Sequence, residues 1–564
     1  MESEGSMGPM VGTQETVVPE RRSLWRRGWV RAVAIVVLVV GMGLLIAAEY
    51  VARHMEPLLR HAVIDSLEDR FHEPVELDSL NVSVVRGLEV QGHGLRLLPA
   101  PDVHRPIVRI NEFSFHATMD DLLHRRARVE TIHVRGIELH IPPHSMHTVV
   151  MGKASKPAIK LAVGQIVCSD ALLVIDTDKP GKQPMEFQIN NLVLKDFGAN
   201  KPFAYEANLI NPKPVGQIHA FGNFGPWNAE SPRDTAVSGQ YTFSHADLGT
   251  IKGIKGTLDS TGQFAGVLGN ITVDGTTNTP DFALEGRGRA LPLRTTFHAI
   301  VDGTTGDTTL APVQAVLGNS SFTASGTVAR VSLHPGEEAH VGTKQNLGHD
   351  IALTVNMPRG RIEDVLNLAV KADQPIMRGA MTMQAKLHIP PGPVSVVDKL
   401  QLAGTVTIKG VEFTSKGLQD KVDGLSMRAQ GKPQEVKEAA HDNTPEVASQ
   451  MTVQFVMSGG MLKAESLQYE LPGAHVQMVG VYAMDRHTFE FDGHVRTDAK
   501  ASEMVTGWKS ALLKPFDGIF AKNGAGLELP ISVNGSGGNY TFGLHDSKLT
   551  ADQMAEQMGK ARKQ

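Results

Sequence analysis

Cysteine is almost absent from this chain of 564 residues, in which Cys168 is the only one. A single thiol cannot form an intrachain disulfide, and structural zinc sites built on cysteine usually need two or more thiolates. One unpaired thiol fits a reducing and an oxidising compartment equally well, so cysteine usage does not indicate where the protein resides. The chain is nevertheless long enough to bury a stable core without cross-links.

Aromatic side chains are also scarce, at 5% of the residues, and the formal net charge is −5. Proteins that bind nucleic acids need a basic face that displaces counterions, and single-strand binders add aromatic rings on which bases stack. The composition therefore argues against a nucleic-acid partner.

The short motifs that mark many enzymes are missing: there is no G-x-S-x-G, Walker A, H-E-x-x-H or EF-hand motif. His140, His144 and His147 have the spacing of metal ligands, but no nearby acid or thiol completes a set, which favours surface histidines. Asp302 and Asp307 flank a glycine-rich turn that could hold Ca²⁺, although turn chemistry alone accounts for both residues. We predict a protein that is not an enzyme, with no catalytic residue, metal or cofactor.

Long hydrophobic runs are limited to one, residues 32–48, which carry no charge. With its flanks it predicts a transmembrane anchor over residues 29–51, long enough for a bilayer core of about 30 Å. Five arginines precede it, so the positive-inside rule places residues 1–28 in the cytoplasm and the main body outside. The alternative is a cleaved signal peptide, for which no clean A-x-A site follows. The candidate anchor residues are Trp29, Arg31, Val36, Leu38, Val40, Leu44, Leu45 and Tyr50.

What fills the rest of the chain is alternation of apolar and polar residues, which is typical of strands with one apolar face. It predicts strands within 80–97, 108–115, 132–141, 239–330, 381–389, 402–408, 452–457 and 476–481. Asp302-Gly303 predicts a hairpin turn. Such strands either stack into a dry sandwich or curl into a trough around another apolar body. The predicted tether to a bilayer favours the trough.

Helices are expected at 48–71, 120–126, 362–371, 499–513 and from Thr550 onward, where Thr550 and Gln553 fit a capping box. Three stretches are expected to be loops, at 144–156, 211–234 and 431–446. The predicted fold is mainly β, with a long antiparallel sheet curled into an elongated groove, one N-terminal transmembrane helix and a few short helices.

One strand carries a break in its alternation. Val108 and Ile110 are in phase, as are Phe113 and Phe115, but the step between the two pairs is odd. The phase therefore flips near Asn111, which requires a bulge or a break. We expect one pair to line the trough and the other to pack against the helix near residues 122–123, and we favour Phe113 and Phe115 as the lining pair.

The chain resembles the AsmA-like proteins of bacterial envelopes, which are related to chorein-type lipid-transfer proteins. The resemblance covers most of the chain: the anchor, FHEPVELDSLNVSVVRGLEVQGHGLRL (71–97), VRINEFSFHATMDDLLHRRARVETIHVRGIELHI (108–141), GRIEDVLNLA (360–369), LAGTVTIKGVEFTS (402–415) and the block 509–542. It rests on order and spacing. It implies a groove-opening module over 52–143, a central repetitive β region over 144–345, a C-terminal β region over 346–545 and a helical tail over 546–564.

The resemblance also implies a function. Such proteins are single-pass in the inner membrane, with a periplasmic β groove along which phospholipid tails travel toward the outer membrane. We therefore expect a role in phospholipid transfer or outer-membrane lipid homeostasis, with membrane phospholipids as partners and other envelope proteins as further candidates. The alternative is an envelope assembly factor or scaffold that assists outer-membrane protein insertion. The candidate groove-lining residues are Phe113, Phe115, Ile132, Val134 and Leu139.

Overall fold

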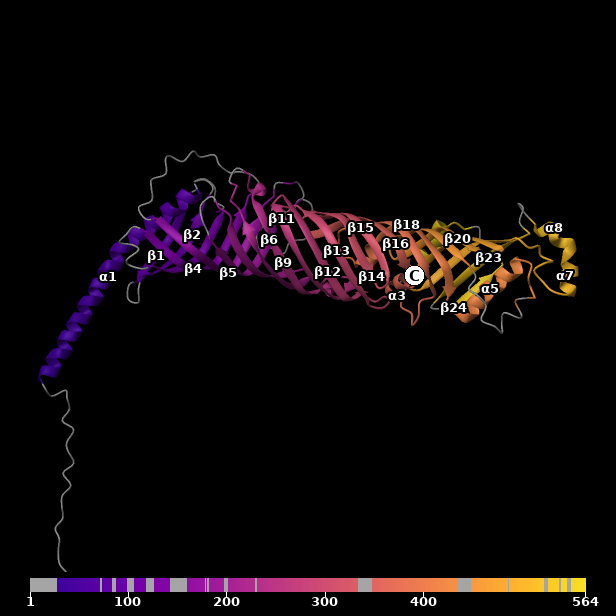
Figure 1. The fold of residues 1–564 in the computed structure, drawn as a ribbon, viewed down its shortest axis with the longest axis horizontal. Coiled ribbons are helices and arrows are strands. Elements are labelled where there is room, and N and C mark those ends of the chain that lie inside the picture. The colour runs from indigo at the N-terminus through magenta and orange to yellow at the C-terminus, as the bar shows by residue number, and fades with distance from the viewer. Residues whose placement is uncertain are drawn as a thin grey trace, which may run out of the picture.

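The computed structural model describes residues 28–71, 74–83, 88–98, 106–117, 126–142, 160–177, 179, 182–196, 201–228, 231–332, 347–434, 436, 448–484, 486–521, 526–536, 539–544 and 549–563. Strands make up most of the described residues, which confirms the prediction of a mainly β protein with a curled, open sheet and few short helices. Successive strands follow one another along the long axis of the molecule, and α1 projects obliquely from one end (Figure 1).

The strands are β1 (Val75–Ser83), β2 (Leu88–Leu97), β3 (Val108–Ala117), β4 (Arg126–Ile141), β5 (Lys160–Ile175), β6 (Met185–Lys195), β7 (Phe203–Pro212), β8 (Val215–Phe224), β9 (Ala236–Asp247), β10 (Ile254–Lys255), β11 (Thr257–Val267), β12 (Asn270–Leu284), β13 (Leu291–Val301), β14 (Thr308–Leu317), β15 (Ser320–Ser332), β16 (Leu347–Arg361), β17 (Met377–Ile389), β18 (Gln401–Phe413), β19 (Gln450–Ser458), β20 (Met461–Leu471), β21 (Ala474–Ala483), β22 (Thr488–Thr497), β23 (Leu527–Ser536) and β24 (Asn539–Gly543).

Each strand pairs with the next one along the chain, apart from the two-residue β10, which pairs with β12 and leaves β9 beside β11. The described pairs are antiparallel except β4 with β5, which run parallel. The region 211–234 is a correction to the sequence prediction, which expected a loop there. β7 continues to Pro212, the chain turns at Lys213 and Pro214, and β8 runs back from Val215. The prolines lie at the end of a strand and in a turn, where no ladder donor is lost.

The helices are α1 (Gly28–Phe71), α3 (Ile362–Ala369), α4 (Val396–Lys399), α5 (Lys416–Ala429), α7 (Trp508–Leu513), α8 (Asp517–Phe520) and α9 (Ala551–Lys563), with 3-10 turns η2 (Pro232–Asp234), η3 (Leu248–Thr250) and η4 (Lys514–Phe516). The helix predicted over 499–513 is too long, because Gly507 has φ +69° and α7 begins after it. The capping box is confirmed: the Gln553 amide donates to Thr550 Oγ1 and the Thr550 amide donates to Gln553 Oε1. The short helix predicted at 120–126 and the loop predicted at 144–156 fall almost entirely outside the described residues.

One face of the sheet is concave, as its first helix shows. The C-terminal part of α1 contacts both β1 and β5, which are four strands apart, so the sheet curves around it. Leu59 and Val63 of α1 are buried there against side chains of β1–β7, including Leu80, Val90 and Phe115. We call this region the N-terminal packed end.

The opposite end is filled in a similar way. Side chains of α3 and α5 pack with buried residues of β16–β22 such as Met381, Ile408 and Tyr469. This is the C-terminal packed end. Helix α9 packs separately, with Met554 fully buried against Val481. Leu462 pairs with the inward-facing Met457 on one side and with Tyr482 on the other, so Tyr482 also faces inward. Val481 is the residue before Tyr482 and therefore faces outward. Helix α9 thus covers the convex face.

A line of irregular residues crosses the N-terminal packed end. Asp78, Gly94, Asn111 and Gly136 are skipped in the pairing registers of β1–β4. Gly94 and Gly136 have φ of +68° and +66°, a region that glycine occupies without a steric cost. The phase break predicted near Asn111 is confirmed, and it belongs to a feature shared by four strands.

Candidate apolar groove

The concave face carries two rows of cross-strand partners that are mostly small or apolar. Directly paired residues project to the same face of a sheet. The first row is Ala207–Ala220–Tyr241–Gly262–Gly275–Phe297, from β7 to β13. The second row is Val313–Ala324–Val355–Ala385–Gly404–Phe455–Ala464, from β14 to β20. A continuous apolar face therefore follows most of the length of the sheet.

Between the packed ends, over β8–β15, the described helices leave most of this face uncovered. We call these strands the open stretch. Their large inward apolar side chains stay half-buried, with Leu317 the one buried exception. The half-buried set includes Ile218, Phe243, Phe264, Val273, Leu293, Phe297, Leu310, Val313 and Phe322. Alternating outward positions are mostly exposed, so the two faces differ as expected for a groove with an accessible apolar floor.

The aromatic rings of the open stretch lie along the floor. A Cβ built on Gly275 would lie 2.7 Å from Cζ of Phe297, and one built on Gly216 would lie 2.7 Å from Cε2 of Phe243. Tyr241 covers Gly262 in the same way. Since each ring occupies the space that a neighbour's side chain would take, the rings add apolar surface without projecting far into the groove.

The predicted lining residues lie on the concave face but within the N-terminal packed end. Phe113, Phe115 and Val134 are buried there, while Ile132 and Leu139 are half-buried. Val108 and Ile110 pack against the same cluster. Both pairs of β3 therefore face the concave side, because the skipped Asn111 turns the two phases the same way. The helix near residues 122–123, against which one pair was expected to pack, lies outside the described residues. The sequence pattern revealed the break but not which residues α1 covers.

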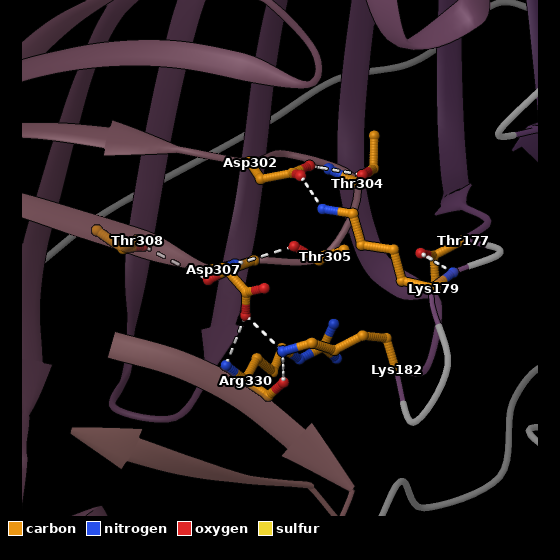
Figure 2. A network of polar contacts seen from close by, with 10 residues as sticks. Thr177, Lys179, Lys182, Asp302, Thr304, Thr305, Asp307, Thr308 and Arg330 are labelled. Carbon is orange, nitrogen blue, oxygen red and sulfur yellow. Dashed lines mark hydrogen bonds and ion pairs between the residues drawn. The ribbon is translucent and has the colours of Figure 1, made fainter. Parts of the chain in front are cut away.

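The two rims of the curled sheet meet along a seam. From β5 the neighbours are β6, β7, β8, β9, β11, β12 and β13, which is seven antiparallel steps. The ends of β5 and β13 therefore lie on opposite rims. Nevertheless Lys179, after β5, contacts Asp302, after β13 (Figure 2). The sheet must be rolled so that one rim meets the other about seven strands later.

This contact is part of a polar network that we call the clasp, formed by Lys179, Lys182, Asp302, Asp307 and Arg330. Lys179 Nζ lies 2.6 Å from Asp302 Oδ2, and Lys182 Nζ lies 2.7 Å from Asp307 Oδ1. Lys182 also donates to the Arg330 carbonyl at 2.5 Å, and the Arg330 amide donates to Asp307 at 2.9 Å. Figure 2 shows the two lysines reaching from one loop to the two aspartates of the other.

The clasp keeps its acids ionised. Burial raises the pKa of Asp302, but hydrogen bonds from Lys179 and Thr304 outweigh it and hold that pKa below its usual value. The pKa of Asp307 is likewise lowered, because hydrogen bonds from Lys182 and the Arg330 amide outweigh burial. The two carboxylates that could have held Ca²⁺ are thus each paired with a lysine ammonium group. No group of three potential metal ligands occurs within the described part of the chain.

The seam is tied at two further points. The Val396 amide donates to the Lys252 carbonyl at 3.0 Å, which joins the segments after β17 and β9. These two strands are also separated by seven antiparallel steps, some of them shared with the first count. Gly253 has φ +102°, and a Cβ there would lie 2.5 Å from Ser395 Oγ, so this tie requires a glycine. The Arg287 guanidinium donates to the Met484 carbonyl, after β12 and β21. The rims are thus held together at intervals.

His140 and Cys168 do not lie on the groove floor of the open stretch. His140 is buried rather than on the surface, with Glu138 at 2.8 Å and Asp176 at 3.4 Å from its ring nitrogens. His144 and His147 lie outside the described residues. Cys168 is buried in the N-terminal packed end, where burial raises its pKa to about 11.

Of the candidate anchor residues, Val36, Leu38, Val40 and Tyr50 are exposed on α1. The side chains of Trp29, Arg31, Leu44 and Leu45 lie outside the described set. Counting described residues alone, none of the helices combines the length and the apolar character that a bilayer crossing needs.

Comparison with known proteins gives no relative: no family model, curated protein or solved structure matches the chain.

Proposed function

We propose that the protein binds the acyl chains of phospholipids on the concave face of its sheet and moves them along it, as part of lipid transfer or lipid homeostasis in a bacterial envelope. The observation that carries the proposal is the open stretch, where large apolar side chains line one face and remain half-buried. Each CH₂ removed from water stabilises a bound chain by about 0.8 kcal/mol. A continuous apolar floor needs no catalytic residue to lower the barrier to movement.

The location is part of the same proposal. The uncharged run 32–48 and the arginines before it support a single-pass anchor in the inner membrane, with a cytoplasmic N-terminus and a periplasmic body. An anchor at that end places the N-terminal packed end nearest the bilayer. The phospholipids of that bilayer would then be the ligands closest to the groove.

Native mass spectrometry of the purified full chain, followed by lipid extraction, tests the proposal. Co-purified phospholipid is the expected result. A Val273→Glu variant should lose most of it, because an acyl chain lying on the floor would have to displace the water around the new carboxylate. Ala265→Glu is the matched control, because it adds the same carboxylate at an exposed, outward-facing position of the neighbouring strand β11.

Absence of lipid from the wild type, or equal loss in both variants, would contradict the proposal. Retention of unfolded outer-membrane protein segments without lipid would instead favour the assembly-factor alternative.

A further inference from the structure

A row of hydroxyl groups crosses the apolar floor in the middle of the open stretch. Ser260, Thr277 and Thr295 are direct cross-strand partners on β11, β12 and β13. Each lies two residues along its strand from a member of the first row of the concave face, so its side chain also projects inward. The row has apolar neighbours at both ends, because Phe243 pairs with Ser260 and Ala315 pairs with Thr295.

Tyr241 adds a fourth hydroxyl from β9. A Cβ built on Gly275 would lie 2.8 Å from Tyr241 Oη, and one built on Gly262 would lie 2.9 Å from the same atom. Because these two glycines have no side chains, the tyrosine ring lies across β11 and β12, and its Oη comes within 3.0 Å of Ser260 Oγ. The four residues that we call the hydroxyl row are Tyr241, Ser260, Thr277 and Thr295.

The hydroxyl row keeps hydrogen-bonding capacity for a ligand. Thr277 Oγ1 lies 2.7 Å from Thr295 Oγ1, and Tyr241 is paired with Ser260. Each hydroxyl carries one hydrogen, and each pair uses one of its two. Within the described part of the chain these are the only side-chain hydrogen bonds of the row, so two hydrogens remain. Tyr241, Thr277 and Thr295 are half-buried, so a ligand in the groove can reach them.

The surroundings of the row favour a neutral acceptor. Inward positions of β11–β13 carry no charged side chain, so an anion placed there would lose its hydration without gaining a counter-ion. A bare hydrocarbon chain would cover the two remaining hydrogens and leave them unpaired, which is also unfavourable. An uncharged carbonyl oxygen accepts hydrogen bonds and donates none, so it satisfies both conditions.

We propose that the hydroxyl row binds the ester carbonyl groups of a diacyl lipid, so that the glycerol backbone lies over β11–β13 and the acyl chains lie on the adjacent apolar floor. This inference rests on the proposed lipid function. Thr277 and Thr295 lie on neighbouring strands about 4.8 Å apart, close enough to serve two carbonyl groups of one molecule. Val273 lies four residues from Thr277 on the same face of β12, at about 13 Å, within reach of an acyl chain.

The test compares the full-length wild type with a Thr277→Val/Thr295→Val variant, which removes both members of one pair and leaves neither unpaired. Native mass spectrometry measures retention of a diacyl phosphatidylglycerol and of its dialkyl ether analogue with the same headgroup and chain lengths. The wild type should prefer the diacyl lipid by about tenfold, because the ether has no carbonyl oxygen to accept the hydrogens. The variant should lose most of this preference while still retaining the ether lipid, which also shows that it is folded.

Two further variants serve as controls. Thr276→Val/Thr296→Val removes the same two hydroxyls from directly paired positions that are exposed on the convex face, and it should keep the wild-type preference. Thr277→Ser/Thr295→Ser keeps the hydroxyls and removes only methyl groups, so it should keep the preference as well. Loss of the preference in either control would overturn the role of the inward hydroxyls.

The possible failures are distinguishable. A wild type that retains neither lipid contradicts the lipid function itself. Equal retention of the diacyl and ether lipids by the wild type, or an unchanged preference in Thr277→Val/Thr295→Val, overturns only the hydroxyl row as a binding site. A free fatty acid that displaces the diacyl lipid from the wild type but not from this variant would assign the row to a carboxylate and overturn the ester assignment.

Discussion

The open stretch and the N-terminal packed end are built from the same alternating strands but differ in what covers them. In β13 the inward side chains Leu293, Thr295 and Phe297 remain half-buried. In β3 the inward Phe113 and Phe115 are 7% and 3% exposed. The difference comes from α1, whose Leu59 and Val63 fill the concave face at one end only.

This comparison separates two properties of a curled sheet. Alternation of apolar and polar residues specifies which face turns inward. The presence or absence of a covering helix specifies whether that face becomes a core or stays available to a ligand. The ends of this protein are stabilised by their own helices, which leaves the centre as the region where a bound apolar body would complete the packing.

The largest expected effect tests this contrast directly. Phe115→Ala should destabilise the N-terminal packed end by about 3–5 kcal/mol, because it leaves a cavity in a closed core. Phe297→Ala should cost about 1–2 kcal/mol in the lipid-free protein, since that ring is only half-buried. Hydrogen exchange of β3 and β13 measures the two losses, and similar losses would show that the two regions do not differ in packing.

A smaller effect is expected at the line of irregular residues that turns both phases of β3 inward. Gly136→Ala should destabilise the packed end by about 1–3 kcal/mol, because φ is +66° and the new Cβ would lie 2.4 Å from Asn111 Nδ2. Gly417→Ala in α5 is the control, since nothing lies within 4 Å and alanine favours a helix. A thermal melt in which Gly136→Ala matches the wild type would contradict this account.

The smallest effect concerns the clasp, which joins the packed end to the open stretch. The pKa values of Asp302 and Asp307 are lowered on folding, so their contribution is present above an ordinary carboxyl pKa of about 3.9 and is lost as pH falls through the folded values. Below about pH 4, exchange protection of residues 302–307 should fall several-fold while that of β3 persists. Asp302→Asn/Asp307→Asn should reproduce this loosening at pH 7. Unchanged protection in that variant would show that the ion pairs do not hold the rims.

Much of the fold could be predicted from the sequence, because strand alternation is a local signal. The missed strand β8 begins after two prolines and contains Gly216 and Gly222, which resemble a loop in composition. The missed helix α5 has a low apolar content, with Leu418, Val422 and Leu425 at helical spacing among polar residues. The clasp could not be predicted, because Lys179 and Asp302 are 123 residues apart and meet only after the roll of the sheet is fixed.

Because the sheet is rolled, the contacts between its two rims fix the number of strands that lie between them. Lys179 contacts Asp302, and Lys252 contacts Val396. In each case seven strand pairings separate the strands that precede the two residues. Loss of a single strand between them would send the second partner to the wrong rim, and duplication of a hairpin would move it two strands along the molecule. Relatives of this protein should therefore vary in length outside the tied segments, while insertions between β6 and β17 should occur within loops and leave the strand count intact.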